Sequence, residues 1–305
     1  MVENRKQHTV PSCYLKAWVD PATPSDQTPY VHLFDRYGGN HRRKSPAKIF
    51  RMPDLYTIFR GAERDLGIER AFSEWESDFV RVRCLIEAEQ FGTGEDAADL
   101  YAFVGAMIAR PPHRIDFMKE QWASIAERMR QIRINPDVPP IRTLSSGPTM
   151  NLMQVQEQAD NPMGTWFPGT VAAYVEAVST RFGCDVLVNE TAEHSFLTSD
   201  SPAVMYHPPT SDPRFSAIPR GLGSPGCEIT LPVSPRLALL FRHKAPGIHA
   251  FIRADWECVF EVNHRTITRA CKSIISDKPD IYFVRTITEF LAKADAVKTT
   301  EENGS

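Results

Sequence analysis

The sequence predicts an α+β fold in which a helix-rich N-terminal half packs with a mainly antiparallel sheet formed largely by the C-terminal half. Apolar residues follow a helical period between residues 61 and 182, whereas short apolar runs bounded by turn residues dominate residues 183–285. With 305 residues, 42% of them hydrophobic, the chain can bury a sizeable core. We therefore expect one domain over residues 1–285, its sheet part in 1–60 and 183–285, then a C-terminal helix and tail over 286–305.

Short strands and turns are expected up to about residue 60. Residues 30–35 are rich in β-forming side chains and end at the turn signal Gly38-Gly39-Asn40. Residues 55–59 predict a second strand. Both belong to the sheet part of the expected domain.

Four helical segments follow in the middle of the chain. Residues 68–86 carry one apolar stripe at alternating four- and three-residue steps. A second helix covers residues 100–108 and ends or kinks at Pro111-Pro112, after which the pattern resumes over 117–129. Residues 136–150, rich in Pro, Ser and Gly, predict a linker or loop, and the last helix of this region covers 170–182.

Strands are expected through most of the C-terminal half. The predicted strands are 186–188, 195–198, 228–232 and 237–242, with a polar insertion rich in Pro and Gly over 203–227. A helix over about residues 263–275 would align Ile267, Cys271 and Ile274, and the last helix would cover 286–294.

The net charge, the apolar runs and the cysteine spacing exclude several classes of protein. The formal charge of −3 gives no overall attraction to nucleic acid or to an anionic membrane, and no apolar run approaches the ~18 residues that span a bilayer. The six cysteines form no C-x-x-C pair, which speaks against a thiolate zinc site and suits reduced thiols. The N-terminus has no secretory signal pattern, so we expect a cytoplasmic protein without membrane contact. The sequence does not predict an oligomeric state.

Several familiar catalytic patterns are missing from the chain. It contains no P-loop, no H-E-x-x-H, no G-x-S-x-G and no dinucleotide-binding glycine pattern. These absences count against a P-loop nucleotidase, a zincin, an α/β-hydrolase and a dinucleotide-dependent oxidoreductase.

Three candidate residues lie in the first half. His8 follows Gln7 just before Pro11, where it could act as a base, ligate a metal or anchor the terminus. Glu76 shares a helical face with Glu69, seven residues earlier, so these carboxylates could hold a divalent ion or form surface ion pairs. Arg110 continues an apolar stripe and therefore needs a partner, either a carboxylate such as Glu76 or a phosphate-bearing ligand.

The second half contributes a polar turn at a strand end. Thr198, Ser199, Asp200 and Ser201 precede Pro202 and could aim a carboxylate and hydroxyls into a cleft, or form a turn without chemistry. Asn263 is read as a substrate-binding residue or as the N-cap of the helix expected there. The isolated histidines are read as surface or capping residues: His113, His243 and His264.

These motifs, in this order, resemble a family of proteins of unknown function, DUF4238. The resemblance covers about residues 5–285 and rests on Gln7-His8-x-Val10-Pro11-x-x-Tyr14-Leu15, a helix bearing Glu76, Arg110-Pro111, Phe196-x-Thr198-Ser199-Asp200-x-Pro202 and Leu231-Pro232-x-Ser234-Pro235. Family members usually carry asparagine where this chain has Ser201. The resemblance implies no established activity, but an association of some bacterial members with defence against phages makes a nuclease or nucleotide-directed hydrolase an expectation.

The leading hypothesis is an intracellular hydrolase of a phosphodiester in nucleic acid or a nucleotide. His8, Glu76, Arg110 and Asp200 would be catalytic, with Asp200, Glu76 and His8 binding a divalent ion such as Mg²⁺, Mn²⁺, Zn²⁺ or Fe²⁺. The substrate-binding residues would be Gln7, Thr198, Ser199, Ser201 and Asn263. The alternatives are a non-catalytic sensor or binding module with the same polar network, and a metal-dependent oxidase or transferase.

Overall fold

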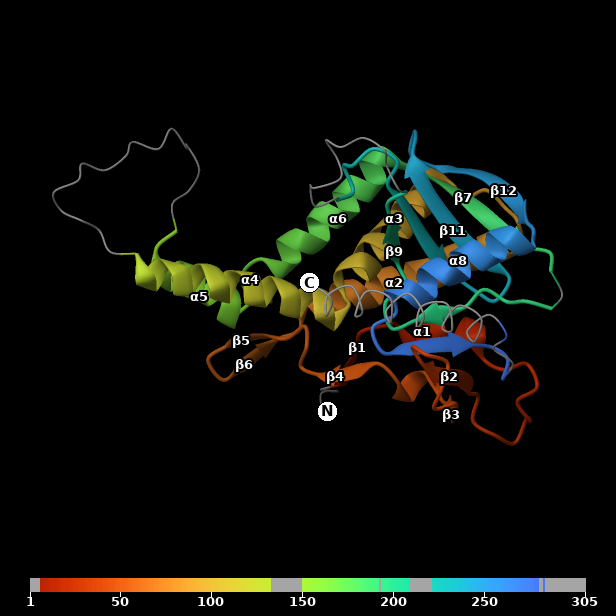
Figure 1. Ribbon diagram of the computed structural model, residues 1–305, viewed down its shortest axis with the longest axis horizontal. Helices are drawn as coiled ribbons and strands as arrows, with labels where there is room; N and C mark the ends of the chain where they lie inside the picture. Colours follow the sequence, from red (N-terminus) through yellow and green to blue (C-terminus); the bar gives the residue numbers. More distant parts are fainter. Residues whose placement is uncertain (1–5, 133–149, 192, 209–220, 280–281, 283–305) are drawn as a thin grey trace, which may run out of the picture.

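The structure is a computed structural model that describes residues 6–132, 150–191, 193–208, 221–279 and 282. Figure 1 shows the larger β-sheets on one side of the molecule, with helices α4 (Pro112–Gln131) and α5 (Leu152–Asp160) extending away from them. The linker expected over 136–150 falls almost wholly, and the helix expected over 286–294 wholly, outside the described residues. None of the described helices is both long and apolar enough to cross a membrane.

The larger sheet has five strands in the order β12-β7-β11-β10-β9. All its pairs are antiparallel except β12 with β7, which is parallel. Because β11 and β12 are consecutive, β7 lies between two strands that follow each other in the chain. The strands are β7 (Phe182–Asn189), β9 (Val204–Tyr206), β10 (Glu228–Pro232), β11 (Leu237–His243) and β12 (Ile248–Ala254).

The smaller sheet joins the two ends of the described chain. It is antiparallel, in the order β3-β2-β13-β8, and β13 pairs with the N-terminal β2 on one side and with β8 on the other. Its strands are β2 (Val31–Asp35), β3 (Arg42–Lys44), β8 (Thr198–Ser199) and β13 (Ser273–Ser276). Two small ribbons complete the β structure: β1 (Lys6–His8) with β4 (Arg51–Pro53), and β5 (Ile58–Arg60) with β6 (Glu63–Asp65).

Several of the helices begin where the sequence supplies a capping side chain or a proline. Thr93 and Asp96 form a capping box at α3, Asn151 and Gln154 form another at α5, and the Asp255 side chain caps α8. Pro112 is the first residue of α4. The α-helices are α1 (Ser12–Leu15), α2 (Gly67–Glu87), α3 (Gly94–Ala109), α4 (Pro112–Gln131), α5 (Leu152–Asp160), α6 (Phe167–Arg181) and α8 (Trp256–Arg269), with 3₁₀ turns η1 (Lys16–Trp18) and η2 (Pro46–Lys48).

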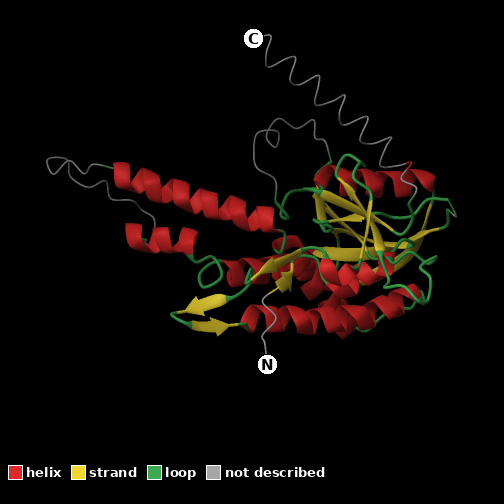
Figure 2. Ribbon diagram, turned by 90° about the horizontal axis from the view of Figure 1, so that it is seen from below, coloured by secondary structure: helices red, strands yellow, loops and turns green. Residues whose placement is uncertain are grey.

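Helices cover both faces of the larger sheet (Figure 2). On one face, Val186, Leu239 and Phe241 belong to the main core with residues of α2 and α3. On the other face, Leu187 and Leu240 pack with Val259 and Val262 of α8. The two faces alternate along each strand, as the period of a β-strand requires. The expected α+β class is therefore confirmed.

The helix expected over 263–275 is wrong. Helix α8 begins at Trp256 and ends at Arg269, and Ile274 lies in strand β13. Asn263 is consequently not an N-cap but lies in the interior of α8, where it is fully buried. The apolar pattern continued past the helix end because Ile274 and Ile275 are both buried, one in a small core and one in the main core. A strand covered on both faces loses the alternation that distinguishes it from a helix.

Candidate functional site

Three of the predicted site residues come together around the Arg110 guanidinium group. Its Nη1 donates to Oε1 of Glu76 at 2.8 Å, and its Nη2 donates to the backbone carbonyl of His8 at 3.0 Å. The guanidinium carbon lies 4.3 Å from the ring centre of Phe72, a cation–π contact. Arg110 is only 2% exposed, and the carbonyl of the same residue accepts a hydrogen bond from the Tyr56 hydroxyl. The predicted Arg110–Glu76 pair is confirmed.

His8 takes part in this cluster through its backbone. Its Nε2 is buried and has no hydrogen-bond partner among the described residues, and burial, with Arg51 as the next cause, lowers the pKa of His8. The imidazole is therefore neutral near pH 7. Gln7 is also buried: its Nε2 donates to Thr57 Oγ1 at 3.1 Å, and its Oε1 accepts from the Tyr56 backbone N–H at 2.6 Å. The first motif thus ties the N-terminus to the segment before α2.

Asp200 lies apart from that cluster. Its Oδ1 accepts from the backbone N–H of Cys271 at 2.9 Å, and its Oδ2 accepts from that of Lys272 at 2.8 Å. Burial raises the pKa of Asp200, and these backbone hydrogen bonds act in the opposite direction. No hydrogen bond or ion pair connects this carboxylate to His8, Glu76 or Arg110, although all four are among the described residues. Asp200 holds the chain where it leaves α8 and enters β13.

The rest of the polar turn is anchored from the N-terminus. Thr198 Oγ1 lies 2.7 Å from the hydroxyl oxygen of Tyr14, which itself donates to the Pro232 carbonyl. Within the turn, Ser199 Oγ accepts from the backbone N–H of Ser201 at 3.1 Å. Trp18 Nε1 donates to the Phe196 carbonyl at 2.9 Å. Two motifs almost 200 residues apart are therefore in direct contact.

Asn263 fixes the strand that leads into this turn. Its Oδ1 accepts from the Leu197 N–H at 2.8 Å, and its Nδ2 donates to the Ser195 carbonyl at 2.9 Å. The oxygen and the nitrogen of the Asn263 side-chain amide are thus both hydrogen-bonded to backbone atoms. Its predicted role in substrate binding stays a prediction, as do those of Gln7, Thr198 and Ser199.

The turn borders two adjoining cavities. The first, which we call the Asp200 cavity, has a volume of about 380 Å³, and its lining includes Phe50, Met52, Pro112, His113, Asp200 and Cys271. The second, the Ser201 cavity, has a volume of about 210 Å³, and its lining includes Ser201, His113, Arg114, His207 and Arg269. His113 lines both cavities, so it lies where they adjoin.

His113 is not the isolated histidine that the sequence suggested. Its Nδ1 lies 3.0 Å from Cys271 Sγ, across 158 positions of sequence. Burial, followed by the charge of Arg114, lowers the pKa of His113. Burial, followed by the charge of Asp200, raises the pKa of Cys271. The pair is therefore a neutral imidazole beside a neutral thiol at pH 7, and a neutral imidazole can accept a proton.

Sequence reasoning missed this pair for a physical reason. The apolar pattern predicts that Cys271 lies in a helix. No sequence spacing relates a cysteine and a histidine that are 158 positions apart and become neighbours only when the chain folds. One signal was present, because His113 comes three residues after Arg110 and directly follows the two prolines that begin α4. A polar residue at the start of a helix next to a motif is a reasonable place to look for a site.

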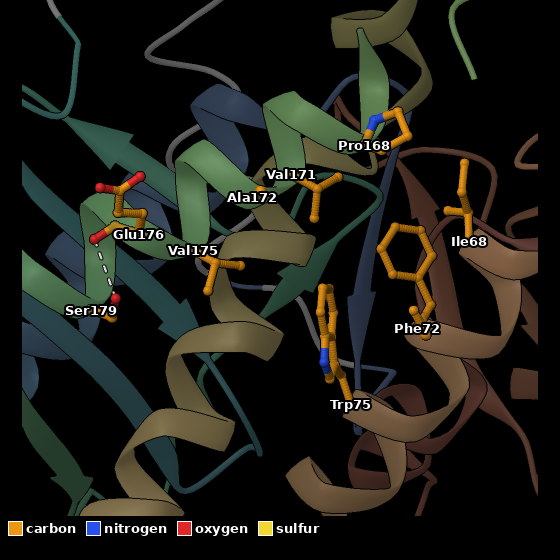
Figure 3. Close-up of a pocket in the computed structure, with 10 residues that line it drawn as sticks. Ile68, Phe72, Trp75, Pro168, Val171, Ala172, Val175, Glu176 and Ser179 are labelled. Carbon is orange, nitrogen blue, oxygen red and sulfur yellow. Dashed lines mark hydrogen bonds between the residues drawn. The ribbon is translucent and has the colours of Figure 1, made fainter. Parts of the chain in front are cut away.

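A third hollow lies between α2 and α6 (Figure 3). Phe72 and Trp75 of α2 point toward Val171 and Val175 of α6 across a groove of about 560 Å³. Apart from Glu176 and Ser179, its lining is apolar. The described residues of its lining bring no acid–base pair together.

The expected metal site has no matching set of ligands in the part of the chain that the structure describes. No group of three His, Cys, Asp or Glu side chains there could hold a metal ion. His8 and Glu76 meet near Arg110, whose positive charge disfavours a cation, while Asp200 is engaged by backbone N–H groups. We therefore derive no step through a metal.

Fold and site together define an α+β protein with two adjoining cavities beside a neutral histidine. The chain belongs to the DUF4238 family, proteins of unknown function, whose family model matches residues 6–280. No curated protein and no solved structure matches it. The predicted family is therefore confirmed.

Proposed function

We propose that this protein is an intracellular hydrolase that cleaves a phosphodiester in a nucleotide or nucleic acid, with His113 as the general base. The observation that carries the proposal is the position of His113, a neutral imidazole shared by two cavities and held at 3.0 Å from Cys271 Sγ. A nuclease of this kind would suit the role in defence against phages that the family resemblance implies.

The chemistry needs only this histidine and water. When Nδ1–H donates to the Cys271 sulfur, Nε2 carries the lone pair and can take a proton from water. The water oxygen then forms a bond to phosphorus, the bond from phosphorus to the leaving oxygen breaks, and the imidazolium returns its proton to that oxygen. Cys271 is a positioning residue here, since its raised pKa keeps the thiol protonated and favours water as the nucleophile.

Hydrolysis assays on the full chain test this proposal. The substrates are bis(p-nitrophenyl) phosphate, single-stranded DNA and RNA, and His113→Gln is compared with His264→Gln, a histidine that lines neither cavity. We expect His113→Gln to lower kcat by about 100-fold or more, as for a lost general base, and His264→Gln to leave it unchanged. Absence of wild-type hydrolysis on all three substrates, or full activity in His113→Gln, contradicts the proposal.

A second candidate function is a non-catalytic binding module, and the Arg110 cluster favours it. The cluster is buried and its hydrogen-bond partners lie within the chain, as in a network that fixes the fold. His113→Gln separates the two functions, because His113 is the proposed base and lies outside the Arg110 cluster. Loss of activity at an unchanged melting temperature favours catalysis, whereas a fall of several degrees, about 1–2 kcal/mol, favours a structural role.

A further inference from the structure

The Ser201 cavity gathers two arginines and a histidine from three separate segments. Arg114 comes from the first turn of α4, Arg269 from the end of α8, and His207 from the segment after β9. Ser201 itself is 3% exposed and lines the same cavity, and none of the described residues of the lining carries a carboxylate. The N-terminus of α4 adds partial positive charge. Nothing in this lining compensates the two guanidinium groups.

Both arginines are available to a ligand. Among the residues that the structure describes, neither side chain forms an ion pair or hydrogen bond, and the buried Nε of Arg114 has no partner there. Three other arginines, in contrast, each pair with a carboxylate: Arg81, Arg242 and Arg265. An unpaired and partly buried guanidinium group is costly, and an anion of matching geometry removes that cost.

The volumes of the two cavities restrict the kinds of ligand that could bind. The Ser201 cavity, at about 210 Å³, is smaller than the ~300 Å³ at which pockets for drug-sized ligands begin, so it suits a small anionic group. The adjoining Asp200 cavity, at about 380 Å³, falls in the range for an organic ligand and presents Phe50, Met52 and Pro112. Phe50 has a positive φ of 52°, which is unusual for a bulky residue and typical of functional sites.

We propose that Arg114 and Arg269 bind a phosphate group in the Ser201 cavity, and that the nucleoside attached to it occupies the Asp200 cavity. Arginine is suited to this role because its planar fork donates two parallel hydrogen bonds to phosphate oxygens. The phosphate then lies beside His113, which lines both cavities. The inference rests on the proposed function for the class of ligand, and it adds the nucleoside phosphate as the unit that the site recognises.

Calorimetric titration of the full chain tests the phosphate site without turnover. The probes are inorganic phosphate and uridine 5′-monophosphate, and the variants are Arg114→Gln, Arg269→Gln and the control Arg70→Gln, an exposed arginine on α2. A lost charge-assisted hydrogen bond corresponds to about 10- to 100-fold in Kd. We expect that loss for both cavity variants and unchanged binding for the control. Because Arg269 is exposed, Arg269→Gln keeps the test valid if Arg114→Gln does not fold.

A separate variant tests whether the nucleoside occupies the Asp200 cavity. Met52→Ala removes a side chain from the larger cavity alone, so it should weaken binding of the monophosphate and leave inorganic phosphate unaffected. Wild-type protein that does not bind phosphate, or equal binding by all arginine variants, overturns the inference. Phosphate binding without any hydrolysis leaves the inference standing and refutes the hydrolase. Hydrolysis lost in His113→Gln, with phosphate binding insensitive to both cavity arginines, refutes the inference alone.

Discussion

Arg110 shows how a single buried charge is stabilised in this protein. The guanidinium group is removed from water, and burial alone would lower its pKa, but Tyr56 and Glu76 act in the opposite direction and raise it. The Glu76 carboxylate supplies the opposite charge, and the face of Phe72 covers the flat side of the group. Breaking such a pair from one side leaves a charge in the interior without compensation.

Replacing Glu76 should therefore be costly. We expect Glu76→Gln to lower the free energy of unfolding by about 3 kcal/mol, because a neutral amide leaves the buried guanidinium charge uncompensated. Its matched control is Glu74→Gln on the same helix, where the side chain is exposed and the change should stay within about 0.5 kcal/mol. Urea unfolding followed by circular dichroism measures both. Equal stabilities of the two variants would show that the pair contributes little.

The lowered pKa of His113 predicts a pH profile for the hydrolase. Catalysis needs the neutral imidazole, so kcat/KM should be flat at and above the ordinary histidine pKa of 6.5 and fall as the pH drops through the lower value. The free energy of unfolding depends on pH in the same direction. The stabilisation linked to His113 is fully present above pH 6.5 and is lost as the pH falls through the lowered pKa. Arg114→Gln removes one cause of the lowering, so it should move the acidic limb to higher pH. If the acidic limb of the Arg114→Gln profile does not move, a group other than His113 controls the pH dependence of kcat/KM.

At the scale of the elements, helices α3 and α6 pack closely because Gly105 has no side chain at their contact. A Cβ on Gly105 would lie 2.6 Å from Val175 Cγ2 and 2.8 Å from the Val175 backbone nitrogen. The two helices can approach this closely only because α3 presents glycine there. Since α6 also forms one wall of the apolar groove, the contact sets the width of that groove.

Two glycine-to-alanine variants separate packing from helix propensity. Gly105→Ala forces the helices apart and should destabilise the protein by about 1–3 kcal/mol, although alanine is the better helix former. At Gly169, in the first turn of α6, an added Cβ meets nothing within 4 Å, so Gly169→Ala should be neutral or stabilising by up to about 1 kcal/mol. Thermal unfolding of both variants gives the comparison, and a stabilised Gly105→Ala would contradict the close contact.

Helix periodicity in the sequence was a good guide where helices are long and amphipathic. It located α2 and α3 because their buried residues repeat on one face. It failed at α8 and β13, where both neighbouring isoleucines of the strand are buried. It also gave no indication of β12, whose residues pair with the distant β7 in parallel. Such pairing is a property of the fold and leaves only a weak pattern in the strand itself.

At the scale of the whole molecule, Tyr14 joins the N-terminal motif to both halves of the C-terminal region. Its hydroxyl contacts Thr198 of the smaller sheet and Pro232 of the larger one. The sequence predicts one site that joins His8, Glu76, Arg110 and Asp200. The first three meet at the Arg110 guanidinium group, whereas Asp200 lies apart from them. The sequence did not predict that Asp200 would point to Cys271 and Lys272 instead of to Arg110, since only the pairing of β8 with β13 decides this.

Tyr14→Phe tests that connection. The variant leaves the Thr198 hydroxyl and the Pro232 carbonyl without a buried partner, so we expect a loss of about 1–3 kcal/mol in the free energy of unfolding. Tyr37→Phe, at a tyrosine that is 58% exposed, provides the control and should change little. Chemical denaturation is again the measurement. A Tyr14→Phe protein as stable as the wild type would mean that packing alone holds the three segments together.

The place of β13 in the smaller sheet has a consequence for biosynthesis. Strand β2 and the turn that follows β8 are translated early and midway, yet both wait for residues 273–276 to complete their pairing. The carboxylate of Asp200 likewise has no partner until Cys271 and Lys272 have left the ribosome. A nascent chain that ends before Cys271 therefore lacks one wall of the Asp200 cavity, and the candidate site is complete only after residues 271–276 have been added.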